Sequence, residues 1–498
     1  MNCELPLELG TPEAFSRIRS FLRSAGYNEA NLCGLLGIER ICDFEQVDLN
    51  RLPGDTGKAA LLSLLTRVFF LLQEAPASEI KSLIPEDVLE SMQTLDLLPR
   101  GDGKAAFESR VWLYPMEELL LASDRNKNLP DAVFPAISPL SYRFLKRMSR
   151  SSVPSALDLC SGSGVAALTL SQHCERVIAS DVSPRAIHFA RFNCLLNDRS
   201  NVAVLESDFY ASLGAETFNR IVAHPPYVPS LSNAVVWRDG GATGEEPIRR
   251  IVAGLPQYLR SGGAFYAACG GFDTKEKTFE QRVRSWLGSA HGEFDVLFAV
   301  EFDKSPWQLA VNQGSTQAGD FQENRQRLLE QFSEIGAVSF VAGALVIERR
   351  TGKETQPDRE PLTLRTQLSP LTDGTCFDTY LGWWRWVCRP EAPQELAPLK
   401  PRLGSTLRVN ITHVVSEQEL LPIAFVIEAL RPFRAETKVD PEMVQVLLRC
   451  DGKTSLAELF EMARAESLVP ERFTLVDFLK FGAKMIERGY LEIDEGLA

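Results

Sequence analysis

The sequence lacks several features that mark other classes of protein. None of its ten cysteines belongs to a Cys-x-x-Cys pair, so neither a structural zinc site nor a disulfide framework is predicted. No apolar run approaches 18 residues, which excludes an ordinary transmembrane helix. The N-terminus has no basic segment followed by an apolar one, so no secretory signal is expected. These absences predict a cytoplasmic protein with reduced cysteines and no metal.

Positive charge is also scarce. The chain has 53 lysines and arginines against 66 aspartates and glutamates, a formal net charge of −13. A protein that binds nucleic acid through an overall positive field has the opposite balance, so nucleic acid is a disfavoured partner unless a local basic patch exists. With 498 residues the chain exceeds one ordinary core, and we expect two to four domains.

The sequence does contain a strand, loop and helix pattern at residues 156–170. A short apolar strand reaches Asp158, the chain turns at Gly162 and Gly164, and an apolar helix follows at once. Glycines let the backbone approach a ligand closely, and the N-terminus of the helix faces that ligand. The pattern predicts a nucleotide-binding cradle, although one glycine-rich loop is a weak signal by itself.

Polar residues also end three further predicted strands. Asp181 ends the run that starts at residue 177, Asp208 ends the run from 202, and residues 218–223 lead directly into His224. In an open α/β sheet the carboxyl ends of the strands line the ligand crevice. We therefore expect these side chains to share one site with the glycine loop.

Residues 130–350 resemble the class I S-adenosylmethionine (SAM)-dependent methyltransferases. Within them, the chain is similar to the group with an Asn-Pro-Pro-Tyr-type motif, which includes release-factor glutamine methyltransferases and several nucleobase methyltransferases. The resemblance rests on three motifs: Asp158-x-x-x-Gly162-x-Gly164, the acidic strand ends and the sequence His-Pro-Pro-Tyr at 224–227. A dinucleotide-binding Rossmann domain is the alternative, but its third glycine would fall at Ala167. The resemblance implies an α/β fold with a Rossmann-like, seven-stranded sheet.

The resemblance also implies a set of residues for the cofactor SAM. Asp158 begins the loop, and Gly162 and Gly164 let it pass beside the methionine part. Asp181 would accept both ribose hydroxyls, while Asp208 would accept the adenine amino group with Phe209 near the ring. The alternative for each acid is a strand-end residue that caps a helix or faces solvent.

The resemblance implies that the motif at 224–227 holds the group that accepts the methyl. In the family the first residue of the motif is Asn, Asp or Ser. Its side-chain oxygen and the backbone carbonyl of the first proline, here Pro225, both accept hydrogen bonds from a planar amino group. Tyr227 would pack on the substrate plane. Here His224 can accept through a neutral ring nitrogen or act as a base, and the alternatives are a core histidine or lost catalysis. The loop at 237–241 is expected either to fold over the acceptor, with Arg238 or Asp239 reading its charge, or to form a tight turn.

Four domains are predicted. Residues 1–125 form a helical substrate-recognition domain, 126–350 the methyltransferase domain, 351–404 a linker or docking segment that contains three tryptophans, and 405–498 a winged-helix-like α+β module. The last helix of that module has few basic residues, which favours contact with protein or peptide over DNA. A purely structural cap is an equal alternative for this module. The Arg-Pro-Glu-Thr-Glu segment of the release-factor enzymes is replaced by residues 136–140.

The predicted function is SAM-dependent methyl transfer to a nitrogen of a protein or peptide. Three alternatives remain open at this point. They are methylation of rRNA or another nucleobase, methylation of a small biosynthetic molecule, and a scaffold that binds SAM without catalysis.

Overall fold

The structure is a computed structural model that describes residues 5–46, 58–99, 106–125, 129–232, 234–316, 319–352 and 360–493. The chain forms two compact units. The first holds Met1–Leu145, Ser151–Ala290 and Lys304–Phe340, and the second holds Lys146–Arg150, His291–Asp303 and Val341–Ala498. Each unit is described by itself below.

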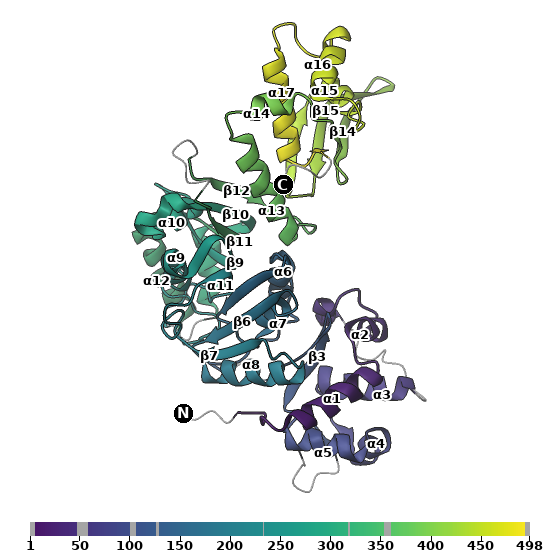
Figure 1. The fold of residues 1–498 in the computed structure, drawn as a ribbon, viewed down its shortest axis with the longest axis vertical. Coiled ribbons are helices and arrows are strands. Elements are labelled where there is room, and N and C mark those ends of the chain that lie inside the picture. The colour runs from purple at the N-terminus through teal and green to yellow at the C-terminus, as the bar shows by residue number, and fades with distance from the viewer. Residues whose placement is uncertain are drawn as a thin grey trace. The chain divides into compact units, whose positions relative to one another are not determined.

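The first unit begins with short helices (Figure 1). They are α1 (Pro12–Ser24), α2 (Glu29–Leu36), the 3-10 helix η1 (Ile41–Gln46), α3 (Lys58–Leu65) with the π-helical turn η3 (Thr66–Phe70), α4 (Ala77–Leu83) and α5 (Glu86–Thr94). Two small antiparallel pairs follow, β1 (Ala75–Pro76) with β2 (Ala106–Phe107) and β3 (Val111–Met116) with β4 (Leu119–Asp124). The α1 residue Arg19 donates to the carbonyls of Leu195 and Leu196, at 3.3 and 3.2 Å, so α1 is anchored to the end of the helix that spans Pro184–Leu196.

A large, mostly parallel sheet follows. Its strands are β5 (Val153–Leu159), β6 (Cys174–Asp181), β7 (Val202–Glu206), β8 (Phe218–Ala223), β9 (Leu259–Thr274), β10 (Phe294–Lys304), β11 (Ala337–Arg349) and β12 (Thr363–Gln367). The strand order is β12-β10-β11-β9-β8-β5-β6-β7. The predicted α/β class is confirmed, but the sheet has eight strands where seven were predicted. The extra strand, β12, lies within the predicted linker and is only half-buried, so it lacks the apolar run by which inner strands are recognised.

Helices precede the first strand of the sheet and lie between later strands. They are α6 (Pro139–Arg147), α7 (Val165–Leu170), α8 (Pro184–Leu196), α9 (Glu246–Tyr258), α10 (Phe279–Trp286), the 3-10 helix η4 (Gly288–Glu293), α11 (Pro306–Gly314) and α12 (Phe321–Glu334). The parallel register aligns Leu159 with both Ser180 and Ala223. The carboxyl ends of β5, β6 and β8 therefore meet at one edge of the sheet.

The second unit contains most of β10 and β11, all of β12, and the elements that follow β12. Those later elements are α13 (Gly374–Val387), α14 (Ala392–Leu396), β13 (Arg402–Leu403), β14 (Arg408–Ser416), β15 (Glu419–Ala429), β16 (Ala435–Val439), α15 (Pro441–Leu447), α16 (Leu456–Ala465), α17 (Leu475–Glu487) and β17 (Leu491–Glu492). Trp383 and Trp386 on α13 stack with centroids 5.2 Å apart and belong to a buried cluster with Phe460, Phe478 and Tyr490. These tryptophans are therefore core residues. The winged-helix assignment of 405–498 stays a prediction.

Among the described residues, no helix is both long enough and apolar enough to cross a membrane.

Candidate functional site

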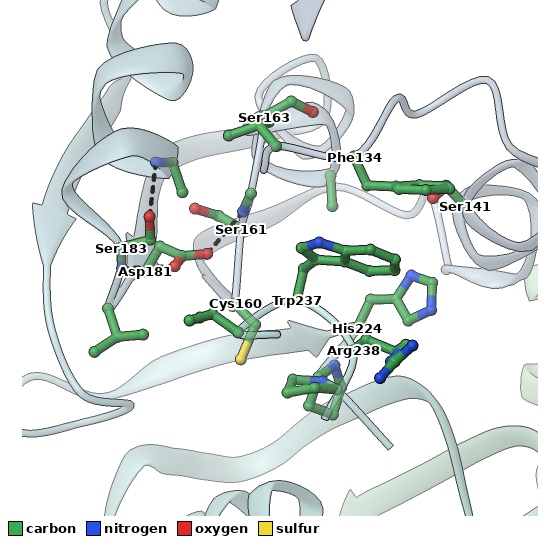
Figure 2. A pocket seen from close by; sticks show the side chains of 18 of the residues that line it. Phe134, Ser141, Cys160, Ser161, Ser163, Asp181, Ser183, His224, Trp237 and Arg238 are labelled. Carbon is green, nitrogen blue, oxygen red and sulfur yellow. Dashed lines mark hydrogen bonds between the residues drawn. The ribbon is translucent and has the colours of Figure 1, made fainter. Parts of the chain in front are cut away.

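A cavity of about 310 Å³ lies in the first unit at the carboxyl ends of β5, β6 and β8. Eight of the nine predicted site residues line it: Asp158, Gly162, Asp181, Asp208, Phe209, His224, Pro225 and Tyr227. The ninth, Gly164, directly precedes α7 and is not part of the lining. The fold thus brings the glycine loop, the acidic strand ends and the His-Pro-Pro-Tyr motif to one place (Figure 2).

The glycine loop needs its two glycines for different reasons. Both have left-handed backbone, with φ of +53° at Gly162 and +78° at Gly164. A β-carbon at Gly164 would lie 3.1 Å from that of Ala190 on α8, whereas one at Gly162 would meet nothing within 4 Å. Gly164 therefore permits close helix packing. Cys160, at φ +57°, adopts the same conformation without being glycine, which is a strain that proteins store at functional sites.

Asp181 holds the loop from the neighbouring strand. One carboxylate oxygen accepts the N–H of Gly162 at 2.9 Å, and the other accepts the N–H of Ser183 at 3.0 Å. Burial raises the pKa of this carboxyl, against the lowering effect of the backbone donors. A carboxylate has about four acceptor positions, so both oxygens retain capacity for the two hydroxyls of a ribose.

Asp158 is placed differently. Its side chain is 1% exposed, and Oδ2 accepts the N–H of Ala167 in the first turn of α7 at 2.9 Å. Burial raises the pKa of this carboxyl to about 8. Asp158 therefore holds the start of the helix, and it lines the cavity as a mainly protonated group near neutral pH.

His224 follows β8 and faces the cavity (Figure 2). Its ring centroid lies 5.3 Å from that of Phe144 and 6.3 Å from that of Tyr227. The surrounding protein lowers the pKa of His224 to about 4, because burial disfavours the charged ring. The imidazole is thus neutral near pH 7, with one ring nitrogen that accepts a hydrogen bond and one that donates.

Two aromatic residues complete the cavity beside His224. Phe134 stacks on Trp237 with centroids 4.9 Å apart and an interplanar angle of 28°, and Figure 2 shows both near His224. The N–H of Val236 also donates to the carbonyl of Pro130 at 2.9 Å. We call the part of the cavity lined by Phe134, His224, Tyr227 and Trp237 the acceptor end, because the residues predicted to hold the acceptor lie there. Sequence reasoning missed Phe134, since a single aromatic outside any periodic pattern carries no signal.

The two charged residues of the loop at 237–241 are placed differently. Arg238 lines the cavity, whereas Asp239 does not. The carboxylate of Asp239 is nearly fully buried, accepts the N–H of Val235 at 3.0 Å and pairs with Nε of Arg238 at 2.8 Å. Asp239 therefore shapes the loop, and of the two residues predicted to read the charge of the acceptor only Arg238 lines the cavity.

Comparison with known proteins identifies the family. A family model described as "Methyltransferase small domain" matches residues 139–292. The release factor glutamine methyltransferase of Moorella thermoacetica is 32% identical over 190 residues, which are 34% of this chain and 67% of that protein. The chain belongs to the class I SAM-dependent methyltransferases, in the glutamine methyltransferase-like group.

Two further relatives of this methyltransferase match over shorter stretches. The release factor glutamine methyltransferase of Xylella fastidiosa is 33% identical over 133 residues, covering 24% of this chain and 48% of that protein. The ribosomal protein uL3 glutamine methyltransferase of Bradyrhizobium diazoefficiens is 29% identical over 167 residues, covering 30% of this chain and 52% of that protein. The chain thus spans about half the length of these two relatives.

SAM is the cofactor of class I methyltransferases, and the size and lining of the cavity fit it. A cavity of this size is at the lower end of the range for small-molecule sites. It offers carboxylate acceptors for hydroxyl and amino groups, an aromatic ring at Phe209 and a loop whose Gly162 has free space beside its α-carbon. Among the described residues, no cluster of three or more His, Cys, Asp or Glu side chains could hold a metal.

Proposed function

We propose that the protein transfers a methyl group from SAM to a nitrogen of a protein or peptide. The observation that carries this proposal is the continuity of one cavity, which joins the loop at Gly162 and the acid Asp181 to the acceptor end at His224. When bound, SAM supplies an electrophilic methyl group on a sulfonium. The residues of the chain then need only hold a nitrogen in line with it and exclude water, which can lower the barrier by up to about 7–11 kcal/mol.

The residues of the site divide this work. Asp181 would accept the two ribose hydroxyls while its bond to Gly162 N–H keeps the loop in place. Asp208 and Phe209 would receive the adenine. Neutral His224 and the carbonyl of Pro225 would accept the N–H groups of a planar acceptor, and Tyr227 and Trp237 would enclose it.

A neutral, planar acceptor suits this environment better than a charged amine. The acceptor end is largely aromatic, and the low pKa of His224 makes its imidazole a poor base for an ammonium group near neutral pH. The named activities of the relatives, glutamine methylation of a release factor and of a ribosomal protein, support an amide nitrogen of a protein as the acceptor. Nucleobase nitrogens share this planar chemistry and are the alternative that the experiment below distinguishes.

The flanking segments are proposed to select the acceptor. Residues 1–125 would recognise the substrate, and 405–498 would contact protein or peptide. The cytoplasmic location remains a prediction from the sequence.

The first test is calorimetric binding of SAM to the full chain and to two variants. Asp181→Ala removes two hydrogen-bond acceptors and should weaken binding on the order of a hundredfold. Glu206→Ala is the matched control, because Glu206 ends the adjacent strand in register with Asp181 but does not line the cavity. Equal, undiminished binding by all three proteins would contradict the assignment of Asp181, and absent binding to the folded wild type would refute the proposed function.

The second test identifies the acceptor. Labelled methyl from SAM is offered to separate pools of protein, RNA and metabolites, with His224→Ala as the control. We expect label in protein that depends on His224. Label in RNA, together with RNA retention that falls steeply with salt, would instead favour the nucleobase alternative. Binding of SAM without methyl transfer to any pool would leave only the alternative of a scaffold that binds SAM without catalysis.

A further inference from the structure

Arg250 on α9 contacts the two residues assigned to the adenine. Its Nη2 donates to Oδ2 of Asp208 at 2.7 Å, and its guanidinium carbon lies 4.5 Å from the ring centroid of Phe209. Asp208 and Phe209 both line the cavity, whereas Arg250 is not among the lining residues. Arg250 therefore contacts both lining residues without lining the cavity itself.

The backbone at Phe209 needs external support. Its φ is +51°, a left-handed conformation that a residue with a bulky side chain rarely adopts. The hydroxyl of Ser207 donates to the carbonyl of Phe209 at 2.8 Å and accepts the N–H of Ser212 at 3.0 Å, which fixes the turn. Strained conformations of this kind persist only where neighbouring groups hold them. Ser207 holds the backbone, and the guanidinium of Arg250 contacts the ring that this turn presents.

We propose that Arg250 is a positioning residue for recognition of the cofactor's adenine. This inference rests on the proposed function, in which Asp208 accepts the adenine amino group. By binding Oδ2, Arg250 leaves Oδ1 of Asp208 for the amino hydrogens. By packing over one face of Phe209, it leaves the other face for the adenine ring.

A contribution to stability alone does not account for this arrangement. The side chains of Arg250 and Asp208 are 46% and 51% exposed, and ion pairs this exposed contribute little to folding. Loss of Arg250 should therefore leave the melting temperature nearly unchanged. Its effect should appear in the choice between ligands that differ at the adenine amino group.

The experiment compares two ligands on the full chain. S-adenosylhomocysteine carries the amino group, and its deaminated analogue S-inosylhomocysteine carries an oxygen there instead. We expect the wild type to prefer the first by roughly tenfold, the discrimination that one hydrogen bond to a charged group gives. Arg250→Gln should lower that ratio at least threefold, mainly through weaker binding of S-adenosylhomocysteine.

Arg249→Gln is the matched control, because Arg249 is the adjacent half-exposed arginine of α9 and pairs with Glu246. Its ratio should equal that of the wild type. An unchanged ratio in Arg250→Gln, or equal weakening of both ligands, would overturn the inference and leave Arg250 a structural residue. A wild type that binds both ligands equally would refute the adenine contact of Asp208 and with it the inference. The proposed methyl transfer would not be affected by that result. Binding of neither ligand would refute the proposed function itself.

Discussion

The ring of Phe134 lies on the indole of Trp237, with centroids 4.9 Å apart and planes 28° apart. The two residues come from opposite sides of the methyltransferase sequence, one before the first strand of the sheet and one after the His-Pro-Pro-Tyr motif. Because both line the cavity next to His224, their stack forms a wall of the acceptor end. This position predicts an effect on the acceptor and none on SAM.

Trp237→Ala should lower kcat/KM for methyl transfer about tenfold while the Kd for SAM stays unchanged. An aromatic pair contributes about 0.5–1.5 kcal/mol beyond its buried area, and the substitution also removes one wall of the site. Trp307→Ala serves as the control, since Trp307 on α11 is 57% exposed and lies outside the cavity. Steady-state kinetics and calorimetry give the two readings. Weaker SAM binding in Trp237→Ala would instead show that the aromatic pair contributes to binding of the cofactor.

The low pKa of His224 makes a prediction about pH. An ordinary histidine titrates near 6.5, but His224 should remain neutral down to about pH 5 because burial lowers its pKa to about 4. A depressed pKa stabilises the folded state above pH 6.5, and that contribution is lost as the pH falls from 6.5 toward 4. The chain has only five histidines. Their ring signals can be followed by NMR, with His224→Asn to assign the signal of His224.

We expect the His224 signal to stay constant between pH 8 and pH 5.5. His224→Asn should retain most of the methyl transfer, because the amide oxygen also accepts a hydrogen bond, whereas His224→Ala should lose roughly 10–100-fold. A midpoint near pH 6.5 would show that the ring is available as a base. In that case the rate should fall tenfold per pH unit below the midpoint.

Much of the site could be predicted because its signals are local. Each apolar run ends in a polar residue, and the parallel register then brings Asp158, Asp181 and His224 to one edge. The environment of each residue could not be predicted in the same way. Asp158 bonds the N–H of Ala167 and is nearly inaccessible, which depends on how α7 starts.

Contacts between segments that are distant along the chain also could not be predicted from the sequence. Phe134 has no pattern of its own, and the pair of Arg250 with Asp208 depends on where α9 lies against the end of β7. The edge strand β12 was missed for a related reason. An edge strand has one neighbour and two partly exposed faces, so residues 363–367 carry little of the apolar signal of an inner strand.

A buried ion pair fixes the segment that carries Phe134. Arg185 on α8 binds both carboxylate oxygens of Asp124, at 2.7 and 2.5 Å, and the side chains are 5% and 4% exposed. Oδ2 of Asp124 also accepts the N–H of Val133 at 2.8 Å. The pair therefore joins β4 and α8 to the wall of the acceptor end.

Arg185→Ala should destabilise the protein by about 3–5 kcal/mol, because it leaves the Asp124 charge buried without a cationic partner. The melting temperature of the first unit should fall by roughly ten degrees. The double variant Arg185→Leu with Asp124→Leu should recover much of this loss, since neither charge remains, and Arg191→Ala, at an exposed position of the same helix, should change little. Thermal unfolding measures all three. If the double variant is as unstable as Arg185→Ala, the loss comes from packing and the hydrogen bond to Val133, and the unpaired charge is not its cause.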